Sequence, residues 1–392
     1  MGIAQENFMH QFPNYISDEQ LMGLALRLGR RGAGLTAENP AVGCVIVRHG
    51  KDGAVIVGRG WTQQGGRPHA ERVALAEAGN RAQGATAYVT LEPCSHHGKS
   101  SPCAEALIEA GIANLVCAHP DPDPRVAGRG FALLTQHAIK TTTGLLEKQA
   151  HRDLCGFLSR TVRGRPWLQV KMALSLDGMI GEKNVGNFPI TGPEAKARTY
   201  GLRARADAIL VGVETVLVDD PSLTVRLSGL NEHSPIRIVL DSKGRTPLDS
   251  QLVQSANDVP VWIVTTGAIA ADKALALESQ GCQVLLVDQD ANGHTDLTQT
   301  LDLLGEKGIN KILAECGAVL SRALLNQSLV DEFFLYRSTK LVGENGLVAL
   351  NGDPDKTLEH FGFTADRKET LGKDTMQVYI RANSLSELYK GK

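Results

Sequence analysis

One histidine, one glutamate and two cysteines in the first third of the chain have the types and spacing of a catalytic metal site. The sequence contains Pro68-His69-Ala70-Glu71 and, further on, Pro93-Cys94 and Pro102-Cys103. One imidazole and two thiolates give zinc three ligands and leave its fourth tetrahedral position to water, which is typical of catalytic rather than structural zinc. Because zinc lowers the pKa of its bound water toward about 7, this pattern predicts hydrolysis at neutral pH.

The glutamate has a separate task in this pattern. Glu71 lies two residues after the histidine, so it can approach the bound water without occupying the metal. We expect it to take a proton from the water and to pass a proton to a departing amine. An H-x-E motif followed by two cysteines is typical of zinc-dependent nucleobase deaminases. Here eight residues separate Cys94 from Cys103, so a loop is inserted between the usual close pair.

Two neighbouring histidines offer an alternative ligand set. His96 and His97 follow Cys94 closely and could complete a closed Cys/His site. A closed site would leave Glu71 without a task, so we expect these two side chains to line the substrate pocket or to face water. Each candidate ligand alone would indicate little, since a single histidine or cysteine is usually an ordinary structural residue. The combination indicates the metal.

Composition and charge narrow the classes of function. The chain has 392 residues, of which 42% are hydrophobic and 21% charged, and its net charge is −2, as expected for a globular protein of two or three domains. The first 160 residues carry 16 lysines and arginines against 14 aspartates and glutamates. This balance provides no basic surface for nucleic acid, so a DNA or RNA editor is disfavoured.

The apolar residues and cysteines predict a cytoplasmic protein that does not enter a membrane. The sequence contains no run of about 18 apolar residues, the length that a transmembrane helix requires. The segment Met1–Pro13 is largely polar and lacks the regions of a secretory signal. Seven scattered cysteines do not suggest a disulfide framework and favour a reducing compartment.

Helical and strand patterns alternate around the candidate zinc ligands. We expect helices at 18–31, 70–78 and 104–109, and strands at 42–47, 55–57, 87–91 and 114–118. This alternation is typical of a layered α/β domain.

A second series of elements begins after a predicted seam near Thr161–Gly164. We expect strands at 208–213, 237–241, 261–265, 284–287 and 311–314, and helices at 194–205, 271–279, 297–307 and 319–327. This order is typical of a doubly wound parallel α/β domain, in which ligands bind beyond the carboxyl ends of the strands.

Several residues at these predicted strand ends fit a phosphate-bearing ligand. No G-x-G-x-x-G motif follows a strand, so the common dinucleotide fingerprint is absent. The segment 311–318 is instead a strand that leads through Gly317 into a helix, and a helix N-terminus attracts anions. Arg203 and Arg226 are candidates for a substrate phosphate, because guanidinium groups offer paired donors. Both could equally be solvated or salt-bridged arginines.

Motifs in both halves of the chain resemble one enzyme family, the bifunctional riboflavin-biosynthesis deaminase/reductases. In the first half they are ENPAVG at 38–43, HAE at 69–71 and LEPCSHHGK at 91–99, with the long loop that ends at Cys103. In the second half they are KMALSLDG at 171–178, DDPSLTVR at 219–226, IVLDS at 238–242 and ECG at 315–317.

The resemblance implies a fold for each half. Residues 14–160 would form a cytidine-deaminase-like three-layer α/β/α domain with zinc. Residues 161–392 would form a dihydrofolate-reductase-like, doubly wound α/β domain that uses NADPH. With one zinc per chain, the deaminase would hydrolyse 2,5-diamino-6-(5-phosphoribosylamino)pyrimidin-4(3H)-one. The reductase would then convert the ribosyl group of 5-amino-6-(5-phosphoribosylamino)uracil to ribityl.

The resemblance also implies roles for residues at matching positions. In the deaminase, Asn39 would hold the ribose or ring of the substrate and Lys99 would reach its phosphate. The residues implied for NADPH are Ala173, Thr215, Asp219, Ser242, Gly317, Ala318, Val319, Leu320, Ser321, Arg322 and Ala323. The residues implied for the reductase substrate are Asn187, Arg203, Leu223, Arg226 and Glu315. The segment Gly186–Ile190 departs from the family pattern, which weakens the assignment of Asn187.

Two other functions are compatible with parts of the sequence. A nucleic-acid or nucleoside deaminase with an unrelated second domain is disfavoured by the charge balance and by the long cysteine loop. An active deaminase whose second domain only binds nucleotide is harder to exclude, since no feature of that domain is as diagnostic as Glu71. The substrates predicted are small phosphorylated pyrimidines, and the sequence leaves open whether the chain forms a homo-oligomer.

Overall fold

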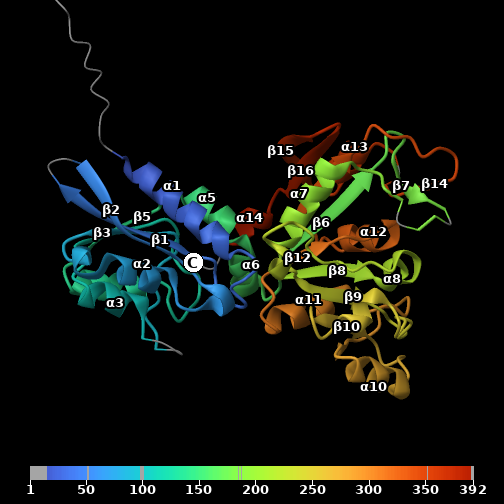
Figure 1. Cartoon of the computed structure of the whole chain (residues 1–392), viewed down its shortest axis with the longest axis horizontal. Helices are drawn as coiled ribbons and strands as arrows, with labels where there is room; N and C mark the ends of the chain where they lie inside the picture. The colour runs from blue at the N-terminus through green and yellow to red at the C-terminus, as the bar shows by residue number, and fades with distance from the viewer. Residues whose placement is uncertain are drawn as a thin grey trace, which may run out of the picture. The chain divides into compact units, whose positions relative to one another are not determined.

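The chain forms two compact units (Figure 1). The structure, a computed structural model, describes residues 16–50, 53–97, 101–183, 185–186, 188–350 and 352–389. The first unit comprises Met1–Arg31, Ala41–Gln63 and Pro68–Ala150, and the second comprises Gly32–Pro40, Gln64–Arg67 and His151–Lys392. Residues 151–160, which we expected in the first domain, group with the second unit, and a domain boundary at 160/161 stays a prediction.

The first unit is built on a five-stranded sheet. Its strands lie in the order β2-β1-β3-β4-β5, with β1 antiparallel to both β2 and β3, and with β3, β4 and β5 parallel. Their bounds are β1 (Gly43–Gly50), β2 (Gly53–Trp61), β3 (Thr86–Val89), β4 (Asn114–Cys117) and β5 (Lys140–Thr143).

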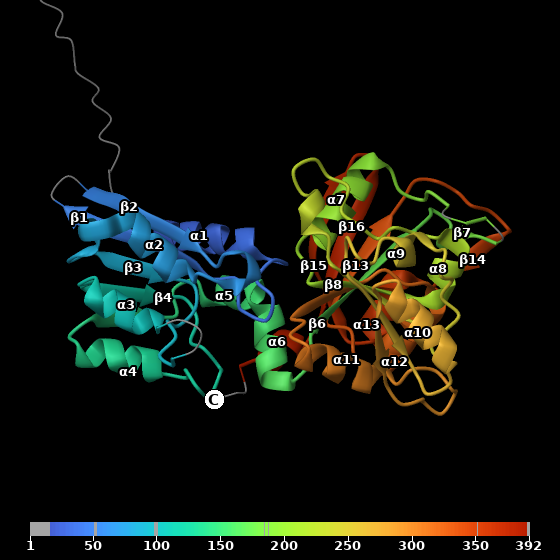
Figure 2. The same cartoon turned by 60° about the horizontal axis from the view of Figure 1, so that its bottom comes forward.

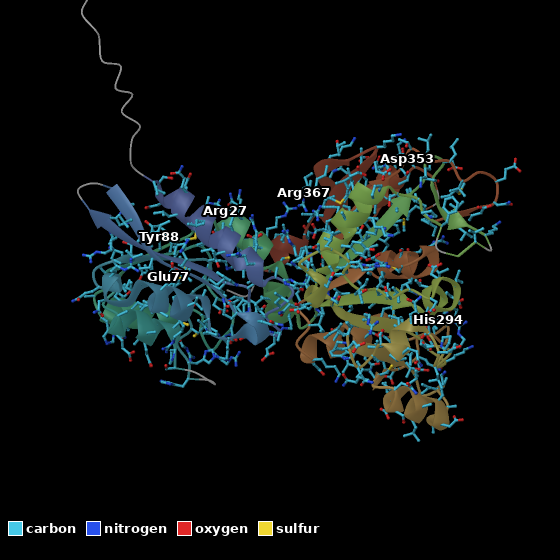
Figure 3. All side chains as sticks on the ribbon, in the orientation of Figure 1. Arg27, Glu77, Tyr88, His294, Asp353 and Arg367 are labelled. Atoms are coloured by element: carbon cyan, nitrogen blue, oxygen red, sulfur yellow. The ribbon has the colours of Figure 1, made fainter. Side chains whose placement is uncertain are left out.

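Helices cover both faces of this sheet, as the three-layer expectation requires (Figures 1 and 2). Helix α1 (Asp18–Gly29) and the start of α5 (Glu147–Asp153) lie on one face, where Leu21 and Ala150 share a core cluster with Val45. The Tyr88 hydroxyl of β3 fastens α1 there by donating to Asp18 Oδ1 at 2.6 Å (Figure 3). The other face carries α2 (Ala70–Ala78), α3 (Cys103–Glu109) and α4 (Arg129–Gln136).

Two glycines bring α2 unusually close to the sheet. A Cβ added at Gly60 of β2 would lie 2.1 Å from the carbonyl oxygen of Ala70, and one at Gly58 would lie 2.1 Å from that of Ala74. Both distances are far below a normal contact, so only glycine permits this approach. The packing fixes the beginning of α2, next to His69 and Glu71.

The second unit contains a nine-stranded sheet and a two-stranded sheet. The large sheet has the order β11-β10-β9-β8-β12-β6-β13-β16-β15, and the small one pairs β14 with β7. The bounds are β6 (Trp167–Leu174), β7 (Met179–Glu182), β8 (Ala208–Gly212), β9 (Ile236–Leu240), β10 (Val261–Thr265), β11 (Gln283–Leu286), β12 (Lys311–Ala314), β13 (Glu332–Arg337), β14 (Gly346–Val348), β15 (Phe363–Leu371) and β16 (Asp374–Arg381).

The expected doubly wound parallel sheet is present, and an antiparallel hairpin extends it. In the spatial order of the sheet, every strand from β11 through β13 runs parallel to its neighbours. Strand β16 is antiparallel to β13, and β15 is antiparallel to β16. Leu371 pairs with Asp374 across a two-residue turn, in which Gly372 has a φ of +64°. A turn this short can join only antiparallel neighbours.

Helices pack on both faces of the large sheet. One core cluster joins Leu210 and Ile238 to α11, α12 and α13, and another joins their neighbours Ile209 and Val239 to α8, α9 and α10. Alternate strand residues therefore point to opposite faces. The helices are α6 (Cys155–Arg163), α7 (Pro193–Arg203), α8 (Val213–Asp219), α9 (Gln251–Gln254), α10 (Ala271–Ser279), α11 (Leu297–Glu306), α12 (Ala318–Asn326), α13 (Pro354–His360) and α14 (Ser384–Glu387). None of the helices in the described ranges is long and apolar enough to cross a membrane.

Candidate zinc site and reductase site

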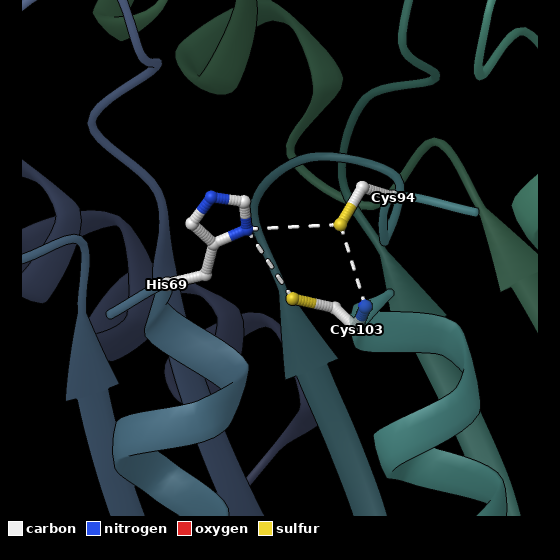
Figure 4. A group of neighbouring side chains, drawn as sticks. All are labelled: His69, Cys94 and Cys103. Carbon is white, nitrogen blue, oxygen red and sulfur yellow. Dashed lines mark hydrogen bonds between the residues drawn. The ribbon is translucent and has the colours of Figure 1, made fainter. Parts of the chain in front are cut away.

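The three predicted zinc ligands lie together in the first unit (Figure 4). His69 Nδ1 is 3.7 Å from Cys94 Sγ and 3.3 Å from Cys103 Sγ, and the three donor atoms lie within 4.8 Å of one another. Two thiols and one imidazole nitrogen are a donor set that suits zinc and leaves one tetrahedral position open. The residues therefore fit the metal.

Two of the ligands lie at helix starts and the third lies in a loop. His69 has the extended backbone of an N-cap residue and directly precedes α2, and Cys103 is the first residue of α3. Cys94 lies in the loop that follows β3, and the backbone N–H of Cys103 donates to its Sγ at 3.3 Å. The prolines before His69 and Cys103 suit these helix starts, because proline disfavours helical backbone in the preceding residue and needs no N–H partner.

The two thiols share a proton unequally. A hydrogen bond from Cys103 is the main reason why the pKa of Cys94 is lowered to about 4. The Cys94 thiolate, together with burial, holds the pKa of Cys103 well above its ordinary range. Because metal ligands must be deprotonated, a cation bound here displaces the second proton as well.

Glu71 lies in the first turn of α2 and is almost completely buried, with 4% of its surface exposed. Burial is the main cause that raises the pKa of its carboxyl group, and the charge of Cys94 raises the pKa further. A carboxylate with a raised pKa is better able to take up and release a proton near neutral pH.

Glu92, whose function we did not predict from the sequence, organises the loop behind the ligands. Its buried carboxylate accepts hydrogen bonds from four backbone N–H groups, those of Asp121 at 3.3 Å, Gly128 at 3.1 Å, Gly130 at 3.0 Å and Phe131 at 3.3 Å. These bonds fix the segment that leads into α4. Its position immediately before Pro93-Cys94 was the only signal available in the sequence.

The same loop carries a second carboxyl group that the sequence analysis did not identify. Asp121 is 8% exposed, and burial raises the pKa of its side chain to about 7. The charges of Asp123, Glu92 and Cys94 also raise it. A carboxyl group that is half-protonated near neutral pH can donate or accept a hydrogen bond from a polar ligand.

The histidine alternative gains no support from the described residues. His97 is exposed, and its Nε2 lies 3.1 Å from Glu105 Oε1. Neither His97 nor His96 belongs to the cluster of donor atoms formed by His69 and the two cysteines. All seven cysteines are free thiols.

Of the residues implied for substrate binding, two lie outside the described part of the chain and a third belongs to a segment that groups with the second unit. Lys99 and Asn187 lie outside the described residues. Asn39 lies in the segment Gly32–Pro40 of the second unit, where its Nδ2 donates to Thr36 O at 3.4 Å. A side chain at Gly66 would collide with Asn39, because an added Cβ would lie 2.1 Å from Asn39 Nδ2.

The residues implied for NADPH gather at the carboxyl ends of parallel strands. Thr215 and Asp219 lie in α8 after β8, Ser242 follows β9, and Gly317 caps α12 after β12. Neighbouring strands β9, β8 and β12 are parallel, so these ends lie along one edge of the sheet. Ala173 lies near the corresponding end of β6.

The first turn of α12 has the properties of a phosphate site. A Cβ added at Gly317 would meet no atom within 4 Å, and the Val319 side chain is 82% exposed. The first N–H groups of a helix have no partner within that helix and attract anions. Ser321 differs from its neighbours, because it is fully buried and its hydroxyl donates to Cys316 O at 3.3 Å. Its side chain thus faces the interior of the unit. The first two turns of α12 also contain the other residues of this helix implied for NADPH, which are Ala318, Leu320, Arg322 and Ala323.

Two residues implied for the substrate are partners of each other. Arg203 Nε donates to Glu315 Oε1 at 2.6 Å, and Arg203 Nη2 donates to Glu315 Oε2 at 3.0 Å. Although burial opposes the charge, Arg203 holds the pKa of Glu315 below its ordinary value. The half-buried Lys171 of β6 lies beside this pair, and partial burial lowers the pKa of its ammonium group.

The other two implied residues differ sharply in exposure. Leu223 is 4% exposed and packs in the core cluster below α8 and α9, with a φ of +53°. Arg226 is exposed, and its Cζ lies 5.5 Å from the ring centroid of Tyr200. Of these two, only Arg226 presents a charged group toward solvent.

Comparisons with known proteins match both units of the chain. Residues 16–119 match the family model of the cytidine and deoxycytidylate deaminase zinc-binding region, and residues 166–375 match that of the RibD C-terminal domain. The chain is 42% identical to the riboflavin biosynthesis protein RibD of Escherichia coli over 350 residues, which cover 86% of this chain and 92% of the relative.

Solved structures give the same result over nearly the whole chain. RibD of Acinetobacter baumannii is 34% identical with a TM-score of 0.81, and the match covers 93% of this chain and 98% of that protein. The diaminohydroxyphosphoribosylaminopyrimidine deaminase/5-amino-6-(5-phosphoribosylamino)uracil reductase of Thermotoga maritima is 29% identical with a TM-score of 0.78 and the same coverage. The chain therefore belongs to the RibD family of riboflavin-biosynthesis enzymes, which combine a zinc-binding deaminase domain and a reductase domain in one polypeptide.

Proposed function

We propose that His69, Cys94 and Cys103 hold one zinc ion and that Glu71 is the acid and base of the deamination. The substrate is 2,5-diamino-6-(5-phosphoribosylamino)pyrimidin-4(3H)-one, and the products are ammonia and the corresponding uracil derivative. The observation that supports this proposal most strongly is the convergence of three donor atoms within 4.8 Å beside a buried glutamate.

The residues of the first site have different roles in the deamination. Zinc, when bound, supplies a water that is acidic enough to ionise near pH 7. The Glu71 carboxylate takes one proton from that water and donates a proton to the amino group as it leaves. Burial favours this transfer in both directions, because it brings the pKa of the carboxyl group closer to neutrality. Asn39 and Lys99 contact the ribose or ring and the phosphate of the substrate.

The second unit reduces the ribosyl group of the deaminated product to ribityl. NADPH, when bound, supplies the hydride. The α12 N-terminus and the strand-end residues Thr215, Asp219 and Ser242 bind the cofactor. Arg226 binds the substrate phosphate, while Arg203 holds Glu315 in place at the substrate. Asn187 and Leu223 contact the same substrate.

The cellular setting follows from the same chemistry. We infer that the chain works in the cytoplasm on small phosphorylated pyrimidines rather than on nucleic acid or at a membrane. The free cysteines and the near-neutral net charge of −2 support this inference.

One experiment tests both steps together. Purified zinc-loaded protein receives the diamino substrate, and ammonia release and NADPH oxidation are followed separately. We expect ammonia release with or without NADPH, and NADPH oxidation only after deamination. Absence of ammonia release would refute the deaminase proposal. Ammonia release without NADPH oxidation would instead favour a second unit that binds nucleotide but does not reduce.

A further inference from the structure

A single tyrosine ring lies against two arginines of the second unit. Tyr200 belongs to α7 and is 7% exposed. The Cζ atoms of Arg203 and Arg226 each lie 5.5 Å from its ring centroid. This distance is within the range of favourable cation–π interactions.

The two arginines have different partners apart from this ring. Arg203 is committed to the protein, because it donates twice to Glu315 and once, through Nη1, to Thr224 O at 3.0 Å. Arg226 is exposed and forms no ion pair with any residue that the structure describes. The Tyr200 ring is therefore the contact that orients the guanidinium group of Arg226.

The backbone that carries Arg226 is held rigidly. Asp220 and Leu223 have φ values of +38° and +53°, a conformation that costs energy for residues other than glycine. Hydrogen bonds from other segments hold this loop in place. Gln251 donates through its backbone N–H to Asp220 Oδ1 at 2.8 Å, and Arg237 Nη1 donates to Ser222 O at 3.2 Å. With its backbone fixed, the side-chain torsions are the main remaining freedom of Arg226.

We propose that Tyr200 is a positioning residue of the reductase step, whose ring holds Arg226 ready to bind the phosphate monoester of the substrate. This inference rests on the proposed role of Arg226. An oriented guanidinium loses less conformational freedom when it binds, so affinity increases without a new contact to the ligand. The ring also joins the substrate arginine to the Arg203–Glu315 pair, because both arginines contact it.

The test is the kinetics of the reductase step with supplied 5-amino-6-(5-phosphoribosylamino)uracil. Loss of the aromatic face in Tyr200→Leu should raise KM for this substrate about 2- to 10-fold and leave kcat nearly unchanged. Tyr200→Phe keeps the aromatic face and should have a KM close to that of the parent. NADPH affinity, titrated by fluorescence, should be the same in all variants, because the Tyr200 ring contacts Arg203 and Arg226, which are not assigned to the cofactor.

A double variant separates positioning from a general packing role. Tyr200 also packs against Val225, so Tyr200→Leu alone could disturb the loop. If Tyr200 acts through Arg226, adding Tyr200→Leu to Arg226→Ala should raise KM no further. A further rise of the same size as in the parent would overturn the inference. Should Tyr200→Leu fail to fold, Tyr200→Met fills similar space and replaces it in the same cycle.

The outcomes also distinguish this inference from the proposed function. A raised KM in Arg226→Ala combined with an unchanged KM in Tyr200→Leu would overturn the positioning role alone. An unchanged KM in Arg226→Ala would remove Arg226 from phosphate binding and would overturn both proposals.

Discussion

The two candidate sites of this chain differ in what their own residues offer to a ligand. In the first unit, two thiols, one imidazole nitrogen and a buried carboxylate lie together, a donor set that suits a cation. In the second unit, Glu315 is already paired with Arg203, and the half-buried Lys171 lies nearby. The first site therefore offers its donor atoms to a cation, whereas in the second the carboxylate is already paired and a ligand binds through other groups.

The sites also differ in how far apart in the chain their parts lie. The zinc ligands and Glu71 all fall between residues 69 and 103, at the starts of two helices and in one loop. The second site combines Lys171, Arg203, Arg226 and Glu315, which are brought together only by the order of strands in the large sheet. Substitutions should consequently act locally at the first site and through long-range pairing at the second.

The largest effect is expected from removing a zinc ligand. Cys94→Ala should abolish both zinc binding and deamination, because two ligands do not hold zinc as three do. Metal analysis of the purified variant measures the zinc content directly. Cys44→Ala is a matched control, since Cys44 is a buried thiol of β1 in the same unit and lies outside the donor cluster. Stoichiometric zinc in Cys94→Ala would show that the ligand assignment is wrong.

The next largest effect concerns the carboxylate that faces this metal site. Glu71→Gln should lower kcat of deamination about 10²- to 10⁴-fold, the usual contribution of a placed acid or base. Zinc content should stay at one per chain, and reduction of supplied deaminated intermediate should survive. Glu77→Gln provides the control on the same helix, because Glu77 pairs with Arg59 at the surface (Figure 3). Deamination within a few-fold of the parent would exclude Glu71 from the mechanism.

The sequence predicted the first site well because each residue type there has few alternative uses. Histidine, two cysteines and a glutamate at fixed spacings are chemically diagnostic, and their helix starts follow from adjacent prolines. The sequence did not indicate that Glu92 would accept four backbone N–H groups, because those donors come from residues 121–131. These four donors reach Glu92 only in the folded loop, so the sequence alone does not predict the hydrogen bonds.

The sequence was less informative about the second site for a physical reason. Arginine and glutamate suit a phosphate, a substrate hydroxyl or each other equally well, so Arg203 and Glu315 were assigned separately although they form one ion pair. The left-handed backbone of Leu223 and the side chain of Tyr200 gave no sequence signal either. The parallel sheet itself was predictable from apolar runs, whereas its antiparallel end depends on the turn at Gly372.

A third prediction tests whether the second site is preassembled. Arg203→Ala removes one partner of a pair whose side chains are only 10% and 14% exposed. The remaining carboxylate would be buried without its main counter-charge, so unfolding free energy should fall by about 3–5 kcal/mol. Arg198→Ala on the same helix breaks the more exposed pair with Glu369 and should cost less than about 1 kcal/mol. Denaturant unfolding of both variants measures the difference. Equal losses would mean that the buried pair contributes no more than a surface pair.

The smallest effect should come from a carboxyl group that accepts two backbone hydrogen bonds. Asp207 Oδ2 accepts from the backbone N–H groups of Asn310 at 3.0 Å and Lys311 at 2.8 Å, yet burial raises its pKa from 3.8 to about 6. Because the folded pKa is the higher one, the protonated group stabilises the fold below pH 4, and this contribution is lost as the pH rises through 6. Asp207→Asn cannot titrate, so the stability of the parent relative to this variant should decline by about 2–3 kcal/mol between pH 4 and pH 7.

Asp366→Asn is the matched control. Arg152 lies 2.5 Å from Asp366 and helps to hold its pKa below the ordinary value, so this contribution is already complete above pH 4. Thermal unfolding midpoints of the three proteins, measured across this range, should diverge for Asp207 alone. A parallel course for both variants would mean that the pKa of Asp207 is not raised in the folded protein.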